Sequence, residues 1–247
     1  MIFLTLQSRE AMKTQKVGHG IGYEREKNGR YSMENWTDKI SVFNGDCMDL
    51  MGRYHDGWFD LAICDPPYQN IDAIGLMDNK KQGKQATKRK QYRLFDNIAP
   101  NNDYYLELER VSKHQIIWGG NYLGLCGGAI VWNKNGTAFG EGEVAICSTH
   151  KSVQIFEYTW NGMIQGDMKN KEDRIHPTQK PVALYNWLLH RYAKPDFKIL
   201  DTHLGSGSHA IAAHYFGCEL VASELDSEYY EASKKRFQLV TSQSKLF

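Results

Sequence analysis

A nucleotide-binding pattern near the C-terminus constrains the fold of this chain more than any other feature. An apolar run over residues 197–201 predicts a strand, the glycine-bearing stretch 202–208 a loop, residues 209–216 a helix, and residues 219–223 a second strand, which Glu224 closes. This order is typical of the nucleotide-binding unit of a doubly wound α/β sheet. The loop reads Gly-Ser-Gly, which lets a nucleoside and an amino acid approach the backbone without holding a pyrophosphate. Because NAD-binding enzymes share such a unit, it alone leaves the ligand open.

A rigid turn follows another predicted strand. Residues 58–64 form an apolar run, and Asp65-Pro66-Pro67-Tyr68 comes directly after it. The two prolines fix φ and remove two backbone donors, so the turn is stiff. It suits the amino group of a planar base: Asp65 and the Pro66 carbonyl would accept its two N–H bonds, and Tyr68 would stack on the ring. The alternative is a proline turn with an incidental Asp and Tyr, a tetrapeptide expected by chance in roughly one chain of this length per thousand.

Two shorter motifs are consistent with a bound nucleoside. A predicted strand over residues 39–43 ends at Asn-Gly-Asp46, where an acid could bind an adenine amino group, although such a sequence is also ordinary turn chemistry. Residues 176–181, His-Pro-Thr-Gln-Lys-Pro, predict the start of a helix. Lys180 and the free N–H groups there would together favour a carboxylate. The alternative is a helix start with an ordinary lysine.

The stretch 80–93 is strongly basic and has glutamines between its cations. Its like charges repel one another unless a polyanion is present. Lysine and arginine suit phosphate oxygens, and glutamine can pair with an adenine edge. The alternative to DNA contact is a solvated surface loop. The seven cations are Lys80, Lys81, Lys84, Lys88, Arg89, Lys90 and Arg93.

Together these motifs resemble the β group of DNA amino-methyltransferases, which methylate adenine N6 or cytosine N4. In that group, as here, Asp-Pro-Pro-Tyr precedes His-Pro-Thr-Gln-Lys-Pro, Asp-x-x-x-Gly-Ser-Gly-Ser and Glu-x-Asp-x-x-Tyr. The resemblance covers residues 39–240. It implies an α/β fold: a Rossmann-like, doubly wound methyltransferase sheet, circularly rearranged, with an antiparallel edge. It also implies S-adenosylmethionine as cofactor and S-adenosylhomocysteine as product.

The resemblance further implies roles for single residues. Glu224 is expected to bind the cofactor ribose, Asp46 its adenine, and Lys180 with Thr178 its methionine carboxylate. Catalysis is expected from Asp65, Pro66, Pro67 and Tyr68. The full set of expected cofactor-binding residues is Asp46, Cys47, Asp65, His176, Thr178, Lys180, Asp201, His203, Gly205, Ser206, Gly207, Ser208, Glu224 and Leu225.

Two departures from the family pattern bear on function. The family usually has Pro-Phe where this chain has Thr202-His203, so the expected ring contact with the cofactor falls to an imidazole. The family often inserts a recognition region before the lysine motif, yet only residues 162–175 are available here. Sequence recognition is therefore expected from the basic loop over residues 69–97, and a homodimer is one way to supply further contacts.

Length and composition favour a single large domain. We expect an N-terminal arm of unknown role over residues 1–38 and one methyltransferase domain over residues 39–247. The formal net charge is +1, so nucleic-acid binding has to come from local patches. The five cysteines form no CxxC pair, and the nine histidines show no ligand spacing, so neither disulfides nor a metal site is expected. No apolar run has transmembrane length. The expected location is the cytoplasm of a bacterial or phage-infected cell.

The predicted function is methyl transfer from S-adenosylmethionine to adenine N6 in duplex DNA, as in restriction-modification systems, with the base flipped out of the helix. Aspartate at the first motif position favours adenine, since related enzymes mostly carry serine there for cytosine. The alternatives are a cytosine-N4 enzyme, an RNA amino-methyltransferase, and a non-catalytic DNA-binding domain of the same fold. The sequence does not reveal the recognition site or a paired restriction enzyme.

Overall fold

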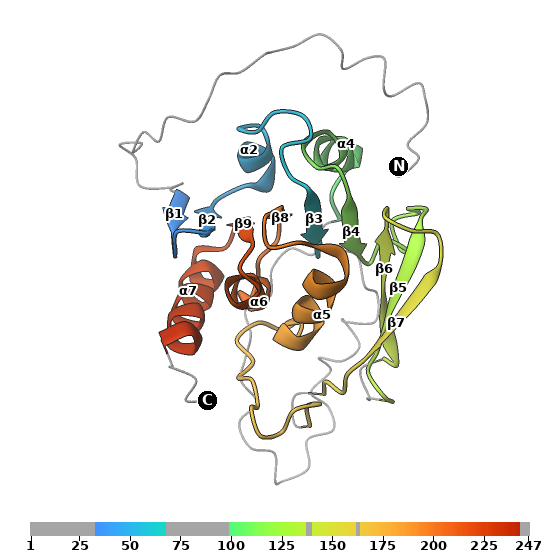
Figure 1. The fold of residues 1–247 in the computed structure, drawn as a ribbon, viewed down its shortest axis with the longest axis vertical. Coiled ribbons are helices and arrows are strands. Elements are labelled where there is room, and N and C mark those ends of the chain that lie inside the picture. The colour runs from blue at the N-terminus through green and yellow to red at the C-terminus, as the bar shows by residue number, and fades with distance from the viewer. Residues whose placement is uncertain (1–32, 68–98, 137–139, 162–163, 243–247) are drawn as a thin grey trace, which may run out of the picture.

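The structure is a computed structural model that describes residues 33–67, 99–136, 140–161 and 164–242. These residues form a nine-stranded sheet with helices on both faces (Figure 1). The strands are β1 (Met33–Asn35), β2 (Ile40–Asn44), β3 (Leu61–Cys64), β4 (Gln115–Trp118), β5 (Gly128–Asn133), β6 (Gly142–Cys147), β7 (Val153–Glu157), β8 (Lys198–Asp201) and β9 (Glu219–Glu224). The helices are α2 (Cys47–Met51), α4 (Asn102–Val111), α5 (Val182–Tyr192), α6 (Ser208–Phe216) and α7 (Ser227–Ser242).

The strand order, β1-β2-β9-β8-β3-β4-β6-β5-β7, has a parallel centre and a mixed edge. Strands β2, β9, β8, β3 and β4 are parallel neighbours, whereas β6 runs antiparallel to both β4 and β5. The chain builds outward from β8 to β9 on one side and from β3 to β4 on the other, so the order reverses between β8 and β3. This confirms the predicted doubly wound sheet with an antiparallel edge. Ligands of such sheets bind at the carboxyl ends of the strands, at the point of reversal.

Helices cover the sheet on two sides (Figure 1), and this explains why the central strand β3 is apolar throughout. In β3, Leu61 and Ile63 pack in the cluster that contains α5 and α6 residues. Ala62 and Cys64 point to the opposite face and pack in the cluster with residues of α2 and α4. Because successive strand residues face opposite sides, a strand buried on both faces shows no alternation of apolar and polar residues.

Several element boundaries differ from the sequence-based expectation. Residues 33–35, which lie in the predicted arm, form β1 and pair antiparallel with β2. The strand expected over residues 58–64 begins only at Leu61, and Phe59 makes an isolated bridge to Ser112.

The helix expected from residue 176 begins instead at Val182, and Pro181 is its N-cap. The preceding residues form a turn in which Gln179 N donates to the His176 carbonyl at 3.2 Å. A residue that precedes proline disfavours the helical conformation, and both His176 and Lys180 precede prolines. Among the helices described, none is long and apolar enough to cross a membrane.

Candidate active site

The predicted site residues that the structure describes lie at one edge of the sheet, where the parallel strands end. Asp46 follows β2, Asp65 follows β3, and Glu224 closes β9. The glycine loop, residues 202–207, connects β8 to α6. Since β8 and β3 are neighbours at the reversal of strand order, this edge brings the candidate cofactor loop beside the candidate catalytic turn.

The catalytic turn leaves β3 with Asp65, which is partly buried, and then Pro66, which is buried. Asp65 Oδ2 accepts a hydrogen bond of 2.5 Å from the Lys180 ammonium, so two separate predicted motifs meet here. Tyr68, the expected stacking residue, lies outside the described residues.

Lys180 contacts a second carboxylate that the sequence did not single out. Its Nζ lies 3.0 Å from Glu143 Oε2, and the other oxygen of Glu143 accepts a 2.5 Å bond from Lys134. Lys180 is 4% exposed, and its ammonium also lies 5.3 Å from the centroid of the Trp118 ring. The result is a chain of alternating charges, Asp65–Lys180–Glu143–Lys134, which we call the charge chain. Any role of Lys180 toward a cofactor carboxylate stays a prediction.

The antiparallel pairing of β6 with β4 and β5 explains why Glu143 and Lys134 lie near Asp65. Trp118, the last residue of β4, pairs with Ala145, so the first residues of antiparallel β6 extend past the carboxyl end of β4. Lys134 follows β5, whose last residue pairs with Gly142. Both side chains are therefore carried to the edge where Asp65 lies. No residue motif signals this, because it depends on strand order and direction.

The two carboxyl groups of the charge chain titrate differently. Burial raises the pKa of Asp65, with further raising by Glu143 and Asp201, and Lys180 opposes it. Burial also acts to raise the pKa of Glu143, but the ammonium groups of Lys180 and Lys134 overcome it and hold that pKa at about 2. Glu143 is therefore the permanent anion of the pair.

Two glycines of the loop have positive φ values, and one of them is also closely packed. Gly207 has φ 75°, and a Cβ there would lie 3.2 Å from the Ser233 Cβ on α7. Gly205 has φ 55°, and a Cβ there would lie 3.8 Å from the His176 ring. L-residues other than glycine rarely adopt such φ values. The loop thus presents bare backbone at the carboxyl end of β8.

Glu224 is joined to this loop. Its Oε2 accepts a 2.8 Å bond from Gly205 N, and its Oε1 accepts a 2.9 Å bond from Asp226 N. Burial nevertheless raises the pKa of Glu224 to about 7, with the two backbone bonds opposing and Asp226 and Asp201 adding to the rise. The carboxylate is held in a fixed position, and further donors would stabilise its charged form.

His203, which replaces the phenylalanine usual in the family, lies in a hydrogen-bonded row. Its Nδ1 is 2.9 Å from the Thr202 hydroxyl, which is in turn 2.6 Å from the Tyr104 hydroxyl. The Tyr104 and His203 rings meet edge to face at 5.6 Å. Burial lowers the pKa of His203 to about 4, with Asp201 and Asp46 opposing, so the imidazole is neutral at pH 7. A neutral ring can take the packing role of phenylalanine.

The remaining predicted cofactor residues surround the same edge. Asp46 is the N-cap of α2, where its side chain accepts from Met48 N at 2.7 Å. Burial raises the pKa of the neighbouring Cys47 thiol to about 12, so it stays protonated. Thr178 Oγ1 is 3.1 Å from His176 Nδ1 in the turn before α5. Leu225 is 63% exposed.

Two buried side chains, Arg236 and Asp201, support the glycine loop, and the sequence did not indicate Arg236. Arg236 on α7 donates to the Ser206 carbonyl at 2.8 Å and to Ser208 Oγ at 3.0 Å, and it pairs with Glu172 at 2.5 Å. Asp201 accepts a 2.9 Å contact from His209 Nδ1 and a 3.0 Å bond from His203 N. These hydrogen bonds and ion pairs hold the glycine loop in position.

The predicted DNA-contacting cations all fall in the segment 68–98, outside the described residues. They are Lys80, Lys81, Lys84, Lys88, Arg89, Lys90 and Arg93. Their contact with DNA stays a prediction.

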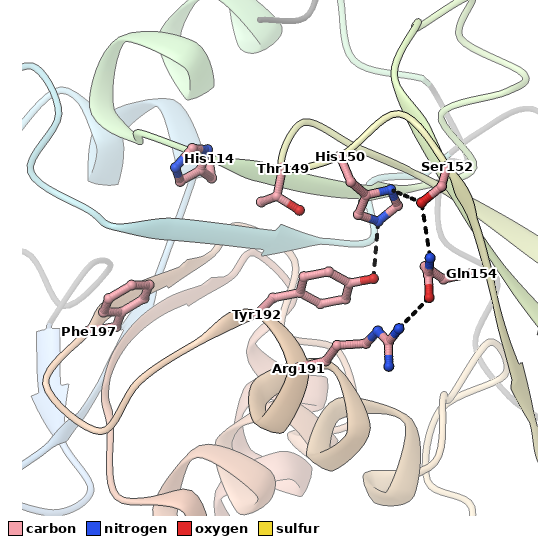
Figure 2. Close-up of a pocket in the computed structure, with 8 residues that line it drawn as sticks. All are labelled: His114, Thr149, His150, Ser152, Gln154, Arg191, Tyr192 and Phe197. Atoms are coloured by element: carbon pink, nitrogen blue, oxygen red, sulfur yellow. Dashed lines mark hydrogen bonds between the residues drawn. The ribbon is translucent and has the colours of Figure 1, made fainter.

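A surface cavity of about 630 Å³ lies near the amino ends of the parallel strands, opposite the candidate active site (Figure 2). His114 precedes β4 and Phe197 precedes β8, so this cavity adjoins the amino ends of strands whose carboxyl ends form the candidate site. Its polar side chains bond one another: the His150 ring is 3.1 Å from the Tyr192 hydroxyl, and Arg191 donates to Gln154. We therefore separate this cavity from the candidate active site.

Comparison with known proteins decides the family. The model of the N6/N4 methyltransferase family, described as DNA methylase, matches residues 77–235, more than half of the chain. The chain belongs to this family of DNA methylases. The predicted resemblance to DNA amino-methyltransferases is confirmed.

Individual relatives agree with this assignment. The methylase is 24% identical to the Type II methyltransferase M2.MboI of Moraxella bovis over 252 residues, 84% of this chain and 91% of that one. Its fold is similar to that of the M1.HpyAVI–SAM complex, with a TM-score of 0.52 at 17% identity, covering 80% of this chain and 99% of that one. It is also similar to the cytosine-N4-specific PvuII DNA methyltransferase, with a TM-score of 0.55 at 13% identity, covering 81% and 87%. At these identities the structural likeness concerns the fold alone.

Proposed function

We propose that the methylase transfers a methyl group from S-adenosylmethionine to the N6 amino group of adenine in duplex DNA. The observation that carries this proposal is the position of Asp65. It stands at the carboxyl end of β3, beside the strand that leads into the glycine loop, at the reversal of strand order. A carboxylate there can accept a hydrogen bond from a base amino group while a cofactor occupies the neighbouring loop.

The residues of the β8–β9 region fit S-adenosylmethionine. Bare backbone at Gly205 and Gly207 leaves room for a nucleoside, and Glu224 is fixed where it can accept from ribose hydroxyls. M1.HpyAVI, whose fold is similar, has a structure in complex with SAM, which supports the same ligand here. When bound, this cofactor supplies an electrophilic methyl group on a sulfonium. Glu224 would hold the ribose and Asp46 the adenine amino group.

Further residues would complete the cofactor site around these anchors. His203 would supply the ring contact, and the exposed Leu225 an apolar surface. His176 faces the loop from the turn before α5, where a Cβ on Gly205 would lie 3.8 Å from its ring, and Thr178 contacts His176. The other contributors in this proposal are Cys47, Asp201, Ser206 and Ser208.

Asp65 and the turn that follows would perform the catalytic work. The adenine leaves the base stack at a cost of a few kcal/mol, which protein contacts offset. Asp65 and the Pro66 carbonyl would then accept the two N–H bonds of the amino group, with Tyr68 stacked on the ring. These bonds draw the amino lone pair out of conjugation and strengthen as positive charge develops on nitrogen. The N–CH₃ bond would form as the S–CH₃ bond breaks, and the cationic amino nitrogen would then release one proton to the Asp65 carboxylate. In-line attack otherwise needs positioning more than acid–base chemistry.

The choice of adenine over cytosine rests on Asp65 as the first residue of the motif and on the basic, glutamine-bearing stretch 80–93. Glutamine pairs with adenine edges, and lysine and arginine pair with duplex phosphates. The fold does not discriminate, because the similar PvuII enzyme is cytosine-N4-specific. In this proposal residues 39–247 act as one domain, with 69–97 as the DNA-contacting loop. The likeness to M2.MboI, a Type II methyltransferase, makes a restriction-modification setting part of the proposal.

Nucleoside analysis tests the acceptor. Plasmid DNA from cells that express the methylase is digested to nucleosides and separated by mass spectrometry. We expect N6-methyladenine, absent from cells that express the Asp65→Ala variant. N4-methylcytosine without N6-methyladenine would overturn the adenine assignment and leave the fold intact. Unmodified DNA from cells with folded protein would contradict the proposal as a whole.

A further inference from the structure

In the charge chain, the Lys180 ammonium that pairs with Asp65 also pairs with Glu143. Lys180 Nζ is 2.5 Å from Asp65 Oδ2 and 3.0 Å from Glu143 Oε2, so one ammonium lies between two carboxylates. The face of the Trp118 ring is a third neighbour of the ammonium, at 5.3 Å. Lys134 pairs with the far oxygen of Glu143 and completes the chain. Three different segments of the fold thus fix where the Lys180 ammonium lies.

This arrangement matters because of the charge that develops during methyl transfer. An isolated Asp65–Lys180 pair would be neutral, and a neutral pair stabilises a cationic amino nitrogen poorly. With Glu143 present, the Lys180 ammonium is shared between two carboxylates. Asp65 therefore keeps more of its negative charge than it would in an isolated pair, and this charge favours the developing cation. Removing one member of a buried charge cluster leaves the others uncompensated, so such a cluster acts as a unit.

We propose that Glu143 is a positioning residue for methyl transfer, which acts on Asp65 through Lys180. It holds the Lys180 ammonium between two carboxylates, so that Lys180 orients Asp65 without neutralising it. This inference rests on the proposed function, because it assigns Asp65 to the acceptor amino group. It assigns Lys180 to the catalytic turn rather than to the cofactor carboxylate.

The groups that act on Asp65 predict opposite effects for two variants. Lys180, from the turn before α5, lowers the pKa of Asp65, whereas Glu143 on β6 and Asp201 on β8 raise it. The neighbouring Tyr185 on α5 is buried, and burial raises its own pKa, so it remains neutral through the working range. Glu143→Gln therefore lowers the pKa of Asp65, and Lys180→Met raises it. Misfolding of the variants alone would not move the two values in opposite directions.

The first experiment is the pH dependence of kcat with DNA for wild type, Glu143→Gln and Lys180→Met. Because Asp65 acts as an ionised acceptor, the acid limb of the profile should move to lower pH in Glu143→Gln and to higher pH in Lys180→Met. At the pH optimum we expect Glu143→Gln to lower kcat by about 10- to 100-fold, the size found for outer partners of active-site ligands, with KM for DNA nearly unchanged. Glu141→Gln is the matched control, since this exposed glutamate lies two residues away and should leave the profile unchanged.

A second measurement does not depend on activity. The carboxyl band of Asp65 is isolated by subtracting the infrared spectrum of Asp65→Asn from each parent, and it is titrated without cofactor or DNA. The same opposite shifts are expected. If Glu143→Gln folds poorly because two ammonium groups then share one carboxylate, the double variant Glu143→Gln/Lys134→Met removes one charge of each sign. It should shift the Asp65 titration in the same direction as Glu143→Gln, by a smaller amount, because loss of Lys134 acts in the opposite sense.

The outcomes separate this inference from the proposed function. A folded wild-type protein that modifies no DNA refutes the function. An active wild type whose acid limb and infrared titration are unmoved by Glu143→Gln refutes the role of Glu143 alone. Calorimetry with S-adenosylmethionine closes the test: Lys180→Met should change the cofactor Kd less than about threefold. A rise of about tenfold or more, 1.4 kcal/mol, would assign Lys180 to the cofactor carboxylate and overturn the inference.

Discussion

Two regions of the carboxyl edge are assembled in different ways. In the cofactor region, residues 201–224, Gly205 donates to Glu224 across 19 positions of sequence. In the catalytic region, Lys180 donates to Asp65 across 115 positions, and Glu143 and Lys134 come from the β5–β6 hairpin. The contacts of the first region join residues that are close in the sequence. The second exists only once the sheet has placed four segments together. Substitutions should therefore separate cofactor binding from methyl transfer.

The largest effect is expected at Asp65, in the catalytic region. Asp65→Ala should reduce methyl transfer by about 10²- to 10³-fold or more, the cost of removing one group that stabilises developing charge. The cofactor Kd should change less than about threefold, or 0.7 kcal/mol, because Asp65 contacts the base. A tritium-transfer assay and calorimetry with S-adenosylmethionine measure the two quantities. The isosteric Asp65→Asn variant controls for shape, and turnover near the wild-type rate in either variant would remove Asp65 from the mechanism.

The reverse pattern is expected at Glu224, in the cofactor region. Hydrogen bonds to a charged group contribute about 1.5–3 kcal/mol, so Glu224→Gln should raise the cofactor Kd by about 10- to 100-fold. At saturating cofactor, kcat should be nearly that of wild type. An unchanged Kd in calorimetry would place the ribose elsewhere.

Stability distinguishes a binding role for Glu224 from a structural one. Burial raises its folded-state pKa to about 7, above the ordinary value of 4.5. The folded state then favours the protonated form, so this contribution to stability is complete below pH 4.5 and is lost as pH rises through 7. Above pH 7 the charge is a cost that glutamine avoids. Thermal melts of Glu224→Gln at pH 8 should thus show no loss of Tm, and a large loss would indicate a structural role.

The two regions also differ in what their sequence could predict. The unit from β8 to β9 follows from apolar runs, glycines with positive φ and a closing acid, all of which are local. Asp65 was found because two prolines mark its turn. Glu143 is the second residue of β6, and Lys134 follows β5, so no motif near either residue signals a site. Their roles depend on β6 running antiparallel beside β4, a pairing of distant segments. α5 begins at Val182, after the predicted hexapeptide 176–181, because Pro177 and Pro181 disfavour the helical conformation at the residues before them.

DNA affinity should respond to changes that touch neither region. Replacing Lys88, Arg89 and Lys90 together with neutral residues removes three phosphate contacts in the proposal. Each contact contributes about 0.9 to the slope of log K against log salt, so the slope should flatten by about two to three units. Binding of duplex DNA is measured across a salt series, with cofactor Kd as the control. An unchanged slope would mean that these three residues make no phosphate contacts and belong to a solvated surface loop.

The smallest effect is expected where this chain departs from its family. Burial lowers the pKa of His203 to about 4 in the folded protein, against an ordinary value of 6.5. The folded state therefore favours the neutral ring, and the contribution to stability is complete above pH 6.5 and lost as pH falls toward 4. Each such group changes the free energy of unfolding by up to about 1.4 kcal/mol per pH unit in this window.

In His203→Phe, the free energy of unfolding should fall less steeply as the pH decreases. At pH 7.5–8.5 it should differ from that of wild type by a constant amount. Because the imidazole is already neutral at pH 7, the cofactor Kd of this variant should stay within about threefold, 0.7 kcal/mol, of wild type. Urea unfolding from pH 8 to pH 5 with calorimetry at pH 7 measures both. Equal slopes in the two proteins would mean that His203 is open enough to solvent to ionise freely, and the family's ring contact would then be missing from this methylase.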